Sequence, residues 1–384
     1  MNEWIRMKLS ECCSSIADGD HQPPPKAETG IPFVTISNMT STNQFDFSDT
    51  LFVPQEYYDK LDEKRKARKD DILYSVVGSF GIPVFMKEDK AFVFQRHIAI
   101  LRPDNEKIVP RFLFYTMLTK DFYARADAAA IGAAQRTVSL TALRNMEICI
   151  PDKIQQSKIV DTLAAYDDLI ENNQKQIKLL EETAQRLYKE WFVDLRFPGH
   201  ENTEILDGIP AGWRIEEVGK LIGKVPRTTQ IMTANYHKSG KIPIIDQSKT
   251  FIAGYTDDET ALVDLGEPVI VFGDHTRILK YIQFPFAKGA DGTQLIVSAN
   301  KNMPQSLLYC GLVNIDLSNY HYARHFKYLK AESLLVPIID IAKQFDEYAG
   351  DLFKRIQVLR DEISSATEAR DRLLPKLMSG EIEL

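Results

Sequence analysis

Polar and basic side chains that suit contact with nucleic acid recur in the turns between short apolar runs. The turns of the first half are DGDHQPPPK, SNMTSTN, SVVGSFG, FQRH and AAQRT, and those of the second half are KVPRTTQ, DQSKTF, GDHTRI and YARHFKY. Gln, Arg, Asn, His, Ser and Thr are the side chains that reach base edges and phosphates. The candidate DNA contacts are Lys26, Ser37, Asn38, Ser79, Gln95, Arg96, His97, Gln135, Arg136, Arg227, Thr228, Gln247, Lys249, His275, Arg277, Arg324 and Lys327.

Each of these residues, taken alone, is more often a solvated loop side chain than a DNA contact. The set favours recognition because its members stand at corresponding places in both halves of the chain, while the sequence between them differs.

The sequence contains none of the short motifs that carry common enzymatic chemistry. There is no GxxxxGK[ST] phosphate loop, no GxGxxG after a strand, no HExxH and no GxSxG. The Asn-Pro-Pro-aromatic loop of amino-methyltransferases is absent, and neither Pro-Asp pair is followed by a nuclease motif. His321 and His325 could share one helical turn, but no third ligand candidate stands nearby, so we expect no metal site.

The net charge of -7 at pH 7 gives the chain no general attraction to DNA. Residues 1–150 carry 19 basic and 20 acidic side chains, and residues 199–337 carry 14 and 15, so both segments are nearly neutral. The attraction between basic groups and phosphates must therefore be local or come from a partner.

The composition predicts a cytosolic globular protein. The hydrophobic content of 44% is ordinary for such proteins, and no run approaches the roughly 18 apolar residues that a membrane span needs. Cys12, Cys13, Cys149 and Cys310 show no CxxC spacing, which argues against a zinc cluster and a disulfide scaffold. We expect reduced thiols, with Cys149 and Cys310 in the core.

Two stretches show the spacing of a coiled-coil seam, with steps of four and three residues. The first lies within residues 154–191 and the second, 186 residues further on, within residues 345–377. The seam positions, which we also consider for partner docking, include Leu163, Ile170, Asn173, Ile177, Leu180, Leu187, Trp191, Leu352, Ile356, Leu359, Ile363 and Leu373. Two long helices with one register indicate a duplicated chain.

The segments before the two helices also repeat each other. Strand-like runs such as GIPFVTIS and DDILYSVVGSFGI correspond to KIPIIDQS and EPVIVFGDHTRI, and the helical PRFLFYTML corresponds to PQSLLYCGL. A strand ending in proline, at NMEICIP and ESLLVP, then precedes each long helix. The fold class is therefore two mixed α/β domains in tandem, each followed by a long helix.

The predicted boundaries are residues 1–150 for the first domain, 151–198 for the first helix, 199–337 for the second domain and 338–384 for the second helix. Helices of about 40 residues extend roughly 60 Å, so they must pair with each other or with another protein. The simplest closed arrangement is an antiparallel pair with an internal pseudo-twofold axis.

Three residues interrupt the apolar pattern of the helices. Asn173 and Arg370 are polar seam positions, which either restrict the register of the pair or face solvent where the seam drifts. Pro375 is expected to end or kink the second helix.

Two stretches, one within and after the first predicted helix and one at the end of the second, carry a resemblance to a known family. The segment ENNQKQIKLLEETAQRLYKEWFVDLRFPGHE and the ending LLPKLMSGEI resemble the central and distal regions of the specificity (S) subunits of type I restriction-modification systems. The order of domain, helix, domain, helix in this chain is also that of the family.

The resemblance implies a non-catalytic subunit that binds double-stranded DNA at a bipartite site. Each domain would read one half, and the helices would set the gap and dock two methyltransferase (modification) subunits. Restriction subunits would join the complex. S-adenosylmethionine, ATP and Mg are expected in those partners, with no cofactor in this chain, which would be cytoplasmic, DNA-associated and bacterial or archaeal.

Two other classes of function stay open at this point. The first is a coiled-coil scaffold whose globular domains bind protein partners. The second, which the missing methyltransferase loop disfavours, is a self-sufficient modification enzyme. Salt-dependent binding of duplex DNA separates the scaffold from a DNA reader, and methyl transfer by the isolated chain would reveal the enzyme.

Overall fold

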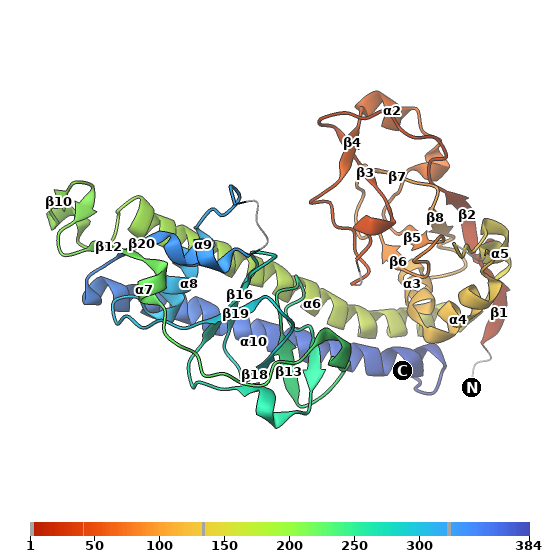
Figure 1. Cartoon of the computed structure of the whole chain (residues 1–384). Helices are drawn as coiled ribbons and strands as arrows, with labels where there is room; N and C mark the ends of the chain where they lie inside the picture. Colours follow the sequence, from red (N-terminus) through yellow and green to blue (C-terminus); the bar gives the residue numbers. More distant parts are fainter. Residues whose placement is uncertain (1–3, 41, 133–134, 321–323) are drawn as a thin grey trace. The chain divides into compact units, whose positions relative to one another are not determined.

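The computed structural model describes residues 4–40, 42–132, 135–320 and 324–384 (Figure 1). The chain divides into two compact units. Unit 1 comprises Met1–Ile170 with Ser365–Leu384, and unit 2 comprises Glu171–Ser364. Two long helices, α6 (Lys153–Tyr188) and α10 (Ile339–Met378), contribute to both units. Each unit therefore combines one globular part with a segment of each long helix.

Unit 1 is a mixed α/β domain built on short strands. They form the sheets β2-β8-β5-β6, β4-β3-β7 and β1-β9, and β3 and β7 run parallel. The strands are β1 (Ile5–Lys8), β2 (Cys13–Asp18), β3 (Ile31–Val34), β4 (Leu51–Val53), β5 (Ile72–Ser75), β6 (Pro83–Phe85), β7 (Val93–Phe94), β8 (Ile98–Pro103) and β9 (Glu147–Ile150). The helices are α1 (Leu9–Cys12), α2 (Gln55–Asp59), α3 (Pro110–Leu118), α4 (Lys120–Ala129) and α5 (Leu140–Asn145).

Unit 2 repeats this order of elements. Its sheets are β17-β16-β19, β14-β13-β18-β15, β12-β20 and the small hairpin β10-β11. The strands are β10 (Ile205–Leu206), β11 (Ile209–Pro210), β12 (Arg214–Glu217), β13 (Ile242–Ile245), β14 (Gly254–Thr256), β15 (Leu262–Val263), β16 (Val269–Gly273), β17 (Leu279–Ile282), β18 (Phe286–Lys288), β19 (Thr293–Ile296) and β20 (Ser333–Val336). The helices are α7 (Val218–Leu221), α8 (Gln305–Val313) and α9 (Phe326–Ala331).

The predicted duplication is confirmed by the pairing of strands within each unit. In unit 1, β3 pairs with β4 antiparallel and with β7 parallel, and in unit 2, β13 pairs in the same two ways with β14 and β18. Likewise, β5 lies between β6 and β8 as β16 lies between β17 and β19. The two-stranded sheets β1-β9 and β12-β20 complete the correspondence.

The two units differ where local sequence differs. Unit 1 has the full strand β2, whereas unit 2 has only the isolated bridge between Ile222 and Ser298. The helical stretch after Pro110 is broken at Thr119, whose extended backbone ends α3. The Thr119 hydroxyl then accepts a hydrogen bond from the Phe122 N–H, which starts α4.

The seam residues of the long helices are buried or half-buried in both units. Within unit 1, Asp167 of α6 pairs with Arg370 of α10, and within unit 2, Asn173 and Glu181 contact Glu362 and Arg360. In unit 1, Lys158 also donates to the Leu384 carbonyl. In each unit, rising numbers on α6 thus meet falling numbers towards the C-terminal end of the chain, so the segments run antiparallel. The predicted antiparallel coiled coil is confirmed.

The seam also belongs to the globular cores. In unit 1, Ile159 and Leu163 of α6 are fully buried in one cluster with Phe112 and Tyr115 of α3. In unit 2, Phe353 of α10 packs against the rings of Tyr281 and Tyr309, with ring centroids 4.5 and 5.4 Å away. The helices are therefore structural parts of both domains as well as partners of each other.

The two polar seam positions are both partnered. Asn173 is only 2% exposed, and its Nδ2 donates to Glu362 Oε2 at 2.8 Å. Arg370 reaches Asp167 at 2.9 Å, where Asp167 also accepts from the Tyr115 hydroxyl at 2.6 Å. Of the two interpretations considered for these positions, the structure shows the one that restricts register.

Two expectations for individual residues need correction. Of the two alternatives for Pro375, an end of the helix is wrong, because α10 continues through the proline to Met378. A kink at Pro375 stays a prediction. Cys310 is buried, but Cys149 is exposed, since it lies on the outward face of β9 beside Arg6. All four cysteines are free thiols.

A substitution of Phe345 tests how much the packing of α10 in unit 2 contributes to the free energy of unfolding. Phe345 is fully buried and lies 5.2 Å from the Phe192 ring and 5.8 Å from the Trp191 ring. Phe345→Ala should lower the free energy of unfolding by about 3–5 kcal/mol through the cavity that it leaves. Leu179→Ala, at a position 61% exposed on α6, should change it by less than about 0.5 kcal/mol. Equal effects of both variants in chemical denaturation would contradict this packing.

Candidate nucleic-acid interface

In unit 2, the side chain of Gln247 joins three loops that carry predicted contacts. Its Oε1 accepts from the His275 N–H at 3.1 Å, and its Nε2 donates to the Asp291 carbonyl at 2.7 Å. The Thr276 hydroxyl donates to the Gln247 carbonyl at 2.7 Å. The ends of β13, β16 and β18 are thereby held together, and the amide group that was predicted to read a base is engaged in hydrogen bonds within the protein.

Gly292 permits this close approach of the loops. Its φ of +82° lies in the left-handed region, and an added Cβ would stand 2.5 Å from His275 Cδ2 and 2.7 Å from Gln247 Nε2. Only glycine fits such a backbone without displacing both side chains.

The segment before α9 is attached to the same loops through Asp274. The Asp274 carbonyl accepts the His325 N–H at 2.8 Å, and its Oδ1 accepts the Phe326 N–H at 2.7 Å. Arg324 and Lys327, both exposed, flank these bonds. His275, Arg324 and Lys327 therefore belong to one loop cluster at the end of the β17-β16-β19 sheet.

A buried lysine of β17 forms hydrogen bonds to the backbone of the loop that carries Gln247. Lys280 of β17 is 4% exposed and donates from Nζ to the carbonyls of Asp246 and Thr250 at 2.8 and 2.6 Å. Burial lowers the pKa of Lys280 to about 8, although the Asp246 carboxylate, 3.8 Å away, acts in the opposite direction. Lys280 thus fixes the loop that carries Gln247 and Lys249.

In unit 1, the corresponding loops are joined through backbone bonds. The Gly78 N–H donates to the Arg136 carbonyl, and the Val76 N–H donates to the His97 carbonyl, both at 2.9 Å. The turn with Ser79, the turn with Arg96 and the segment with Gln135 therefore meet beyond the end of β5. Burial, and then the charge of Arg96, lowers the pKa of His97.

Most of the predicted contacts lie on the surface, where DNA could reach them. Exposed are Lys26, Ser37, Ser79, Arg96, Gln135, Arg136, Arg227, Lys249, His275, Arg277, Arg324 and Lys327, and half-buried are Gln95, His97, Thr228 and Gln247. Some are partly engaged, since Arg136 pairs with Asp127 and Arg277 donates to the Leu317 carbonyl at 3.0 Å. Their contacts with DNA stay predictions.

Asn38 differs from the other predicted contacts because its side chain is only 9% exposed and forms hydrogen bonds within its own loop. Its Oδ1 accepts from the Thr35 N–H at 2.9 Å, and its Nδ2 donates to the Asp46 and Asp49 carbonyls at 3.2 Å each. This geometry supports a structural role for Asn38.

Two predicted contacts of unit 2 and one of unit 1 lie outside the loop clusters. Arg227 and Thr228 precede Thr229, whose N–H donates to the Thr260 carbonyl beside β15. Lys26 precedes Ala27, whose N–H donates to the Phe52 carbonyl of β4. These three residues, which were chosen because the two halves of the sequence correspond, therefore do not lie in the loop clusters.

The roles of Lys280 and Asp274 were not predicted from the sequence. A lysine within the strand sequence LKYI normally faces solvent, so only the structure reveals it as an internal donor. The Asp of GDHTRI stood in a predicted turn, but the bonds that it accepts come from a segment about 50 residues away.

The residues that the structure describes include no group of three or more His, Cys, Asp or Glu able to hold a metal ion. His321 lies outside the described residues, and His325 is buried with its N–H bonded to Asp274. No described helix is long and apolar enough to cross a bilayer.

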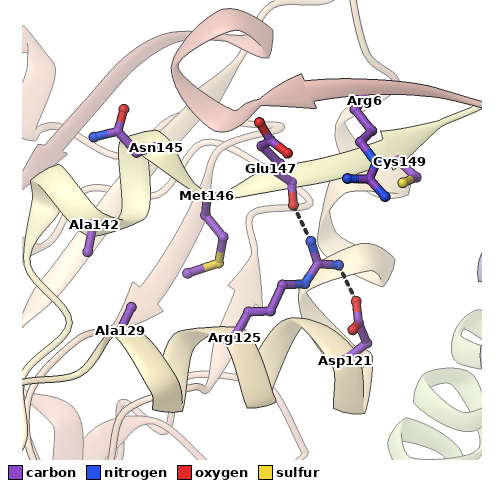
Figure 2. Close-up of a pocket in the computed structure, with 9 residues that line it drawn as sticks. All are labelled: Arg6, Asp121, Arg125, Ala129, Ala142, Asn145, Met146, Glu147 and Cys149. Carbon is purple, nitrogen blue, oxygen red and sulfur yellow. Dashed lines mark hydrogen bonds and ion pairs between the residues drawn. The ribbon is translucent and has the colours of Figure 1, made fainter.

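A pocket of about 730 Å³ lies in unit 1, away from the predicted contacts (Figure 2). Arg125 of α4 crosses it, donates to the Glu147 carbonyl at 2.5 Å and pairs with Asp121. Arg6 and Cys149 line its other side from β1 and β9. Two basic and two acidic side chains line the pocket, so it offers no strong preference for an anion.

Comparison with known proteins agrees with the resemblance in the sequence. A family model, described as the type I restriction modification DNA specificity domain, matches residues 1–182. The MjaIX specificity subunit of Methanocaldococcus jannaschii is 27% identical over 305 residues, which are 72% of this chain and 70% of that protein. The resemblance to type I specificity subunits is confirmed.

Other specificity subunits show the same relationship. The HindI specificity subunit of Haemophilus influenzae is 30% identical over 202 residues, 50% of this chain and 42% of that protein. The crystal structure of the type I S subunit from M. genitalium has a TM-score of 0.60 and 18% identity, covering 98% of this chain and 96% of that one. This likeness shows the fold of the specificity subunits, and the relatives support the prediction that this chain is not itself an enzyme.

The buried Lys280 predicts a specific dependence of stability on pH. Its pKa of about 8 in the folded protein lies below the ordinary value of 10.5. Between these two pH values the unfolded chain binds the proton and the folded chain does not, so the free energy of unfolding should rise with pH. Below about pH 8 both states are protonated and this contribution is constant.

Lys280→Met should remove that rise, as measured by chemical denaturation between pH 7.5 and about 10. Lys249→Met, an exposed position on the same loop, is the matched control and should keep it. A parental rise that persists unchanged in Lys280→Met would contradict the assignment.

Proposed function

We propose that this chain is the DNA-binding specificity subunit of a type I restriction-modification complex. The observation that carries the proposal is the duplication: two units of one topology each gather polar and basic loop residues at corresponding strand ends. A duplicated reader matches a bipartite DNA site, with one half contacted by each domain. The relatives named as specificity subunits support this assignment.

The size of each loop cluster suits a short half-site. A good pair of contacts to one base gives about 1–3 kcal/mol of discrimination, so a small domain specifies only a few base pairs. Two domains joined by paired helices multiply their specificities and add the spacing between half-sites as a further variable. The helices α6 and α10 are proposed to set that spacing.

The same helices are proposed to dock two methyltransferase subunits. The seam residues are buried against the other helix or the domains. The methyltransferase subunits would therefore contact the apolar side chains of α6 and α10 that remain exposed. These include Leu179, 61% exposed, and Tyr348, 60% exposed, as well as Leu169 and Val358. Exposed large apolar side chains of this kind supply the apolar part of protein interfaces.

The chemistry would lie in the partners. S-adenosylmethionine would be bound by the methyltransferase subunits, and ATP and Mg would serve restriction subunits, in a cytoplasmic complex on DNA. The exposed apolar side chains also fit the second candidate, a scaffold that binds only proteins. Sequencing the methylated bases of a host that carries the gene with its methyltransferase tests the choice, because only the DNA reader predicts a bipartite modified site.

Exchange of one domain tests the division of labour. Replacing residues 1–150 by those of another specificity subunit should change one half of the methylated sequence and leave the other half intact. The reason is that each unit has its own core and loop cluster. A change in both halves, or in neither, would exclude independent readers.

A change in helix length tests the proposed spacing role. Adding four residues, about one helical turn, to α6 and a matching four to α10 should alter the gap between the half-sites and preserve their sequences. The measurement is again the methylated sequence in a host. An unchanged gap in a variant that still methylates would exclude this role.

A further inference from the structure

Residues 60–69 of unit 1 form a basic segment within a domain, residues 1–150, whose total charge is near neutral. The sequence KLDEKRKARK carries six basic and two acidic side chains. It directly follows α2 and contains the 3-10 turn η2 (Glu63–Arg65). This segment was not among the predicted contacts, although a run of basic residues is a recognised sign of a phosphate-binding surface.

Only some of these charges are engaged within the domain. Lys66 and Arg68 pair with Glu63 at 2.7 and 2.5 Å, and Arg65 faces Asp20 at 3.8 Å. Lys60 and Lys64 are exposed and make no ion pair with the residues that the structure describes. Their charges are therefore available to a ligand.

A single buried carboxylate attaches this segment to the reading loops. Asp20 is 8% exposed, and its carboxylate accepts the hydroxyl of Tyr57 in α2 and faces Arg65 in η2. The backbone of Asp20 donates to the Phe94 carbonyl at 2.8 Å and accepts the Arg96 N–H at 2.9 Å. One residue thus links α2, which Lys60 follows, and η2, which contains Lys64, to the turn of Gln95 and Arg96.

The contacts of Asp20 with Tyr57 and Arg65 persist at neutral pH. Burial, followed by the hydrogen bond to Asp20, raises the pKa of Tyr57 to about 12, so its hydroxyl stays a donor at neutral pH. The Arg65 guanidinium supplies a positive charge beside the same carboxylate. The contacts of Tyr57 and Arg65 with the buried Asp20 carboxylate therefore hold the basic segment in position.

We propose that Lys60 and Lys64 bind phosphates of the duplex next to the half-site that the first domain reads. The inference rests on the proposed DNA-reading function and names residues that supply affinity without sequence preference. Lysine is a compact charge that suits phosphate, and contacts to phosphates position a protein on DNA without reading it. Asp20 is the positioning residue of this arrangement.

The test measures how binding depends on salt. The chain is assembled with its methyltransferase subunits, and binding to the methylated duplex sequence and to a scrambled duplex is measured over a series of salt concentrations. Lys60→Gln with Lys64→Gln should make the slope of log K against log salt shallower by about 1.8, since each phosphate contact contributes about 0.9. The loss should be similar on both duplexes, and the methylated sequence should stay the same.

The matched control removes two positive charges from the other end of the same domain. Lys8 precedes α1 and β2, and Lys107 pairs with Asp104, which bonds to Cys12 near the start of β2. Both lie at the opposite end of the β2-β8 ladder from Asp18. Lys8→Gln with Lys107→Gln should leave the slope unchanged, and Lys60→Arg with Lys64→Arg should retain it.

The outcomes separate this inference from the proposed function. An unchanged slope in the Lys60, Lys64 variant, with normal specific binding by the parent complex, would overturn the phosphate contacts and leave the DNA reader intact. Weaker assembly with the methyltransferase, at an unchanged slope, would also overturn them and point to an acidic protein partner. No specific duplex binding by the parent complex would instead refute the proposed function.

Discussion

The antiparallel pairing of α6 and α10 is the constraint on which the rest of the fold depends. In each unit, residues of both helices complete a hydrophobic core that the short strands cannot close alone. The partnered polar positions, Asn173 with Glu362 and Arg370 with Asp167, restrict which residues can face each other. A sheet of three or four short strands has little area to bury, so the helices supply much of what makes each domain stable.

The loop clusters also depend on buried charged groups within each domain. Their side chains can hold a defined geometry only because buried groups behind them are fixed. Lys280 holds the Asp246–Thr250 loop in unit 2, and Asp20 holds the turn of Arg96 in unit 1. Charged groups are costly to bury, and each here is compensated by hydrogen bonds or an opposite charge. Pre-organised loops lose less conformational entropy when they bind.

Duplication explains why the two units share topology and differ in their polar details. The same order of strands places the ends of β3, β5 and β7 together in unit 1 and those of β13, β16 and β18 together in unit 2. Unit 2 joins its loops through the side chain of Gln247, whereas unit 1 uses backbone bonds at Gly78 and Val76. The strands keep the same topology in both units, whereas the residues of the loops can differ and so suit different half-sites.

The sequence alone determined the features that depend on local periodicity. The seam at residues 154–191 and 345–377, the two α/β domains and their repeat all follow from spacing and order, because the pattern of apolar residues dictates which face is buried. The tertiary structure alone decided the roles of single polar residues. Asn38 and Gln247 turned inward, Lys280 became an internal donor, and Asp20 joined Arg65 to the Arg96 turn. Such roles depend on partners far apart in the chain, and a one-dimensional pattern does not record which distant group a side chain meets.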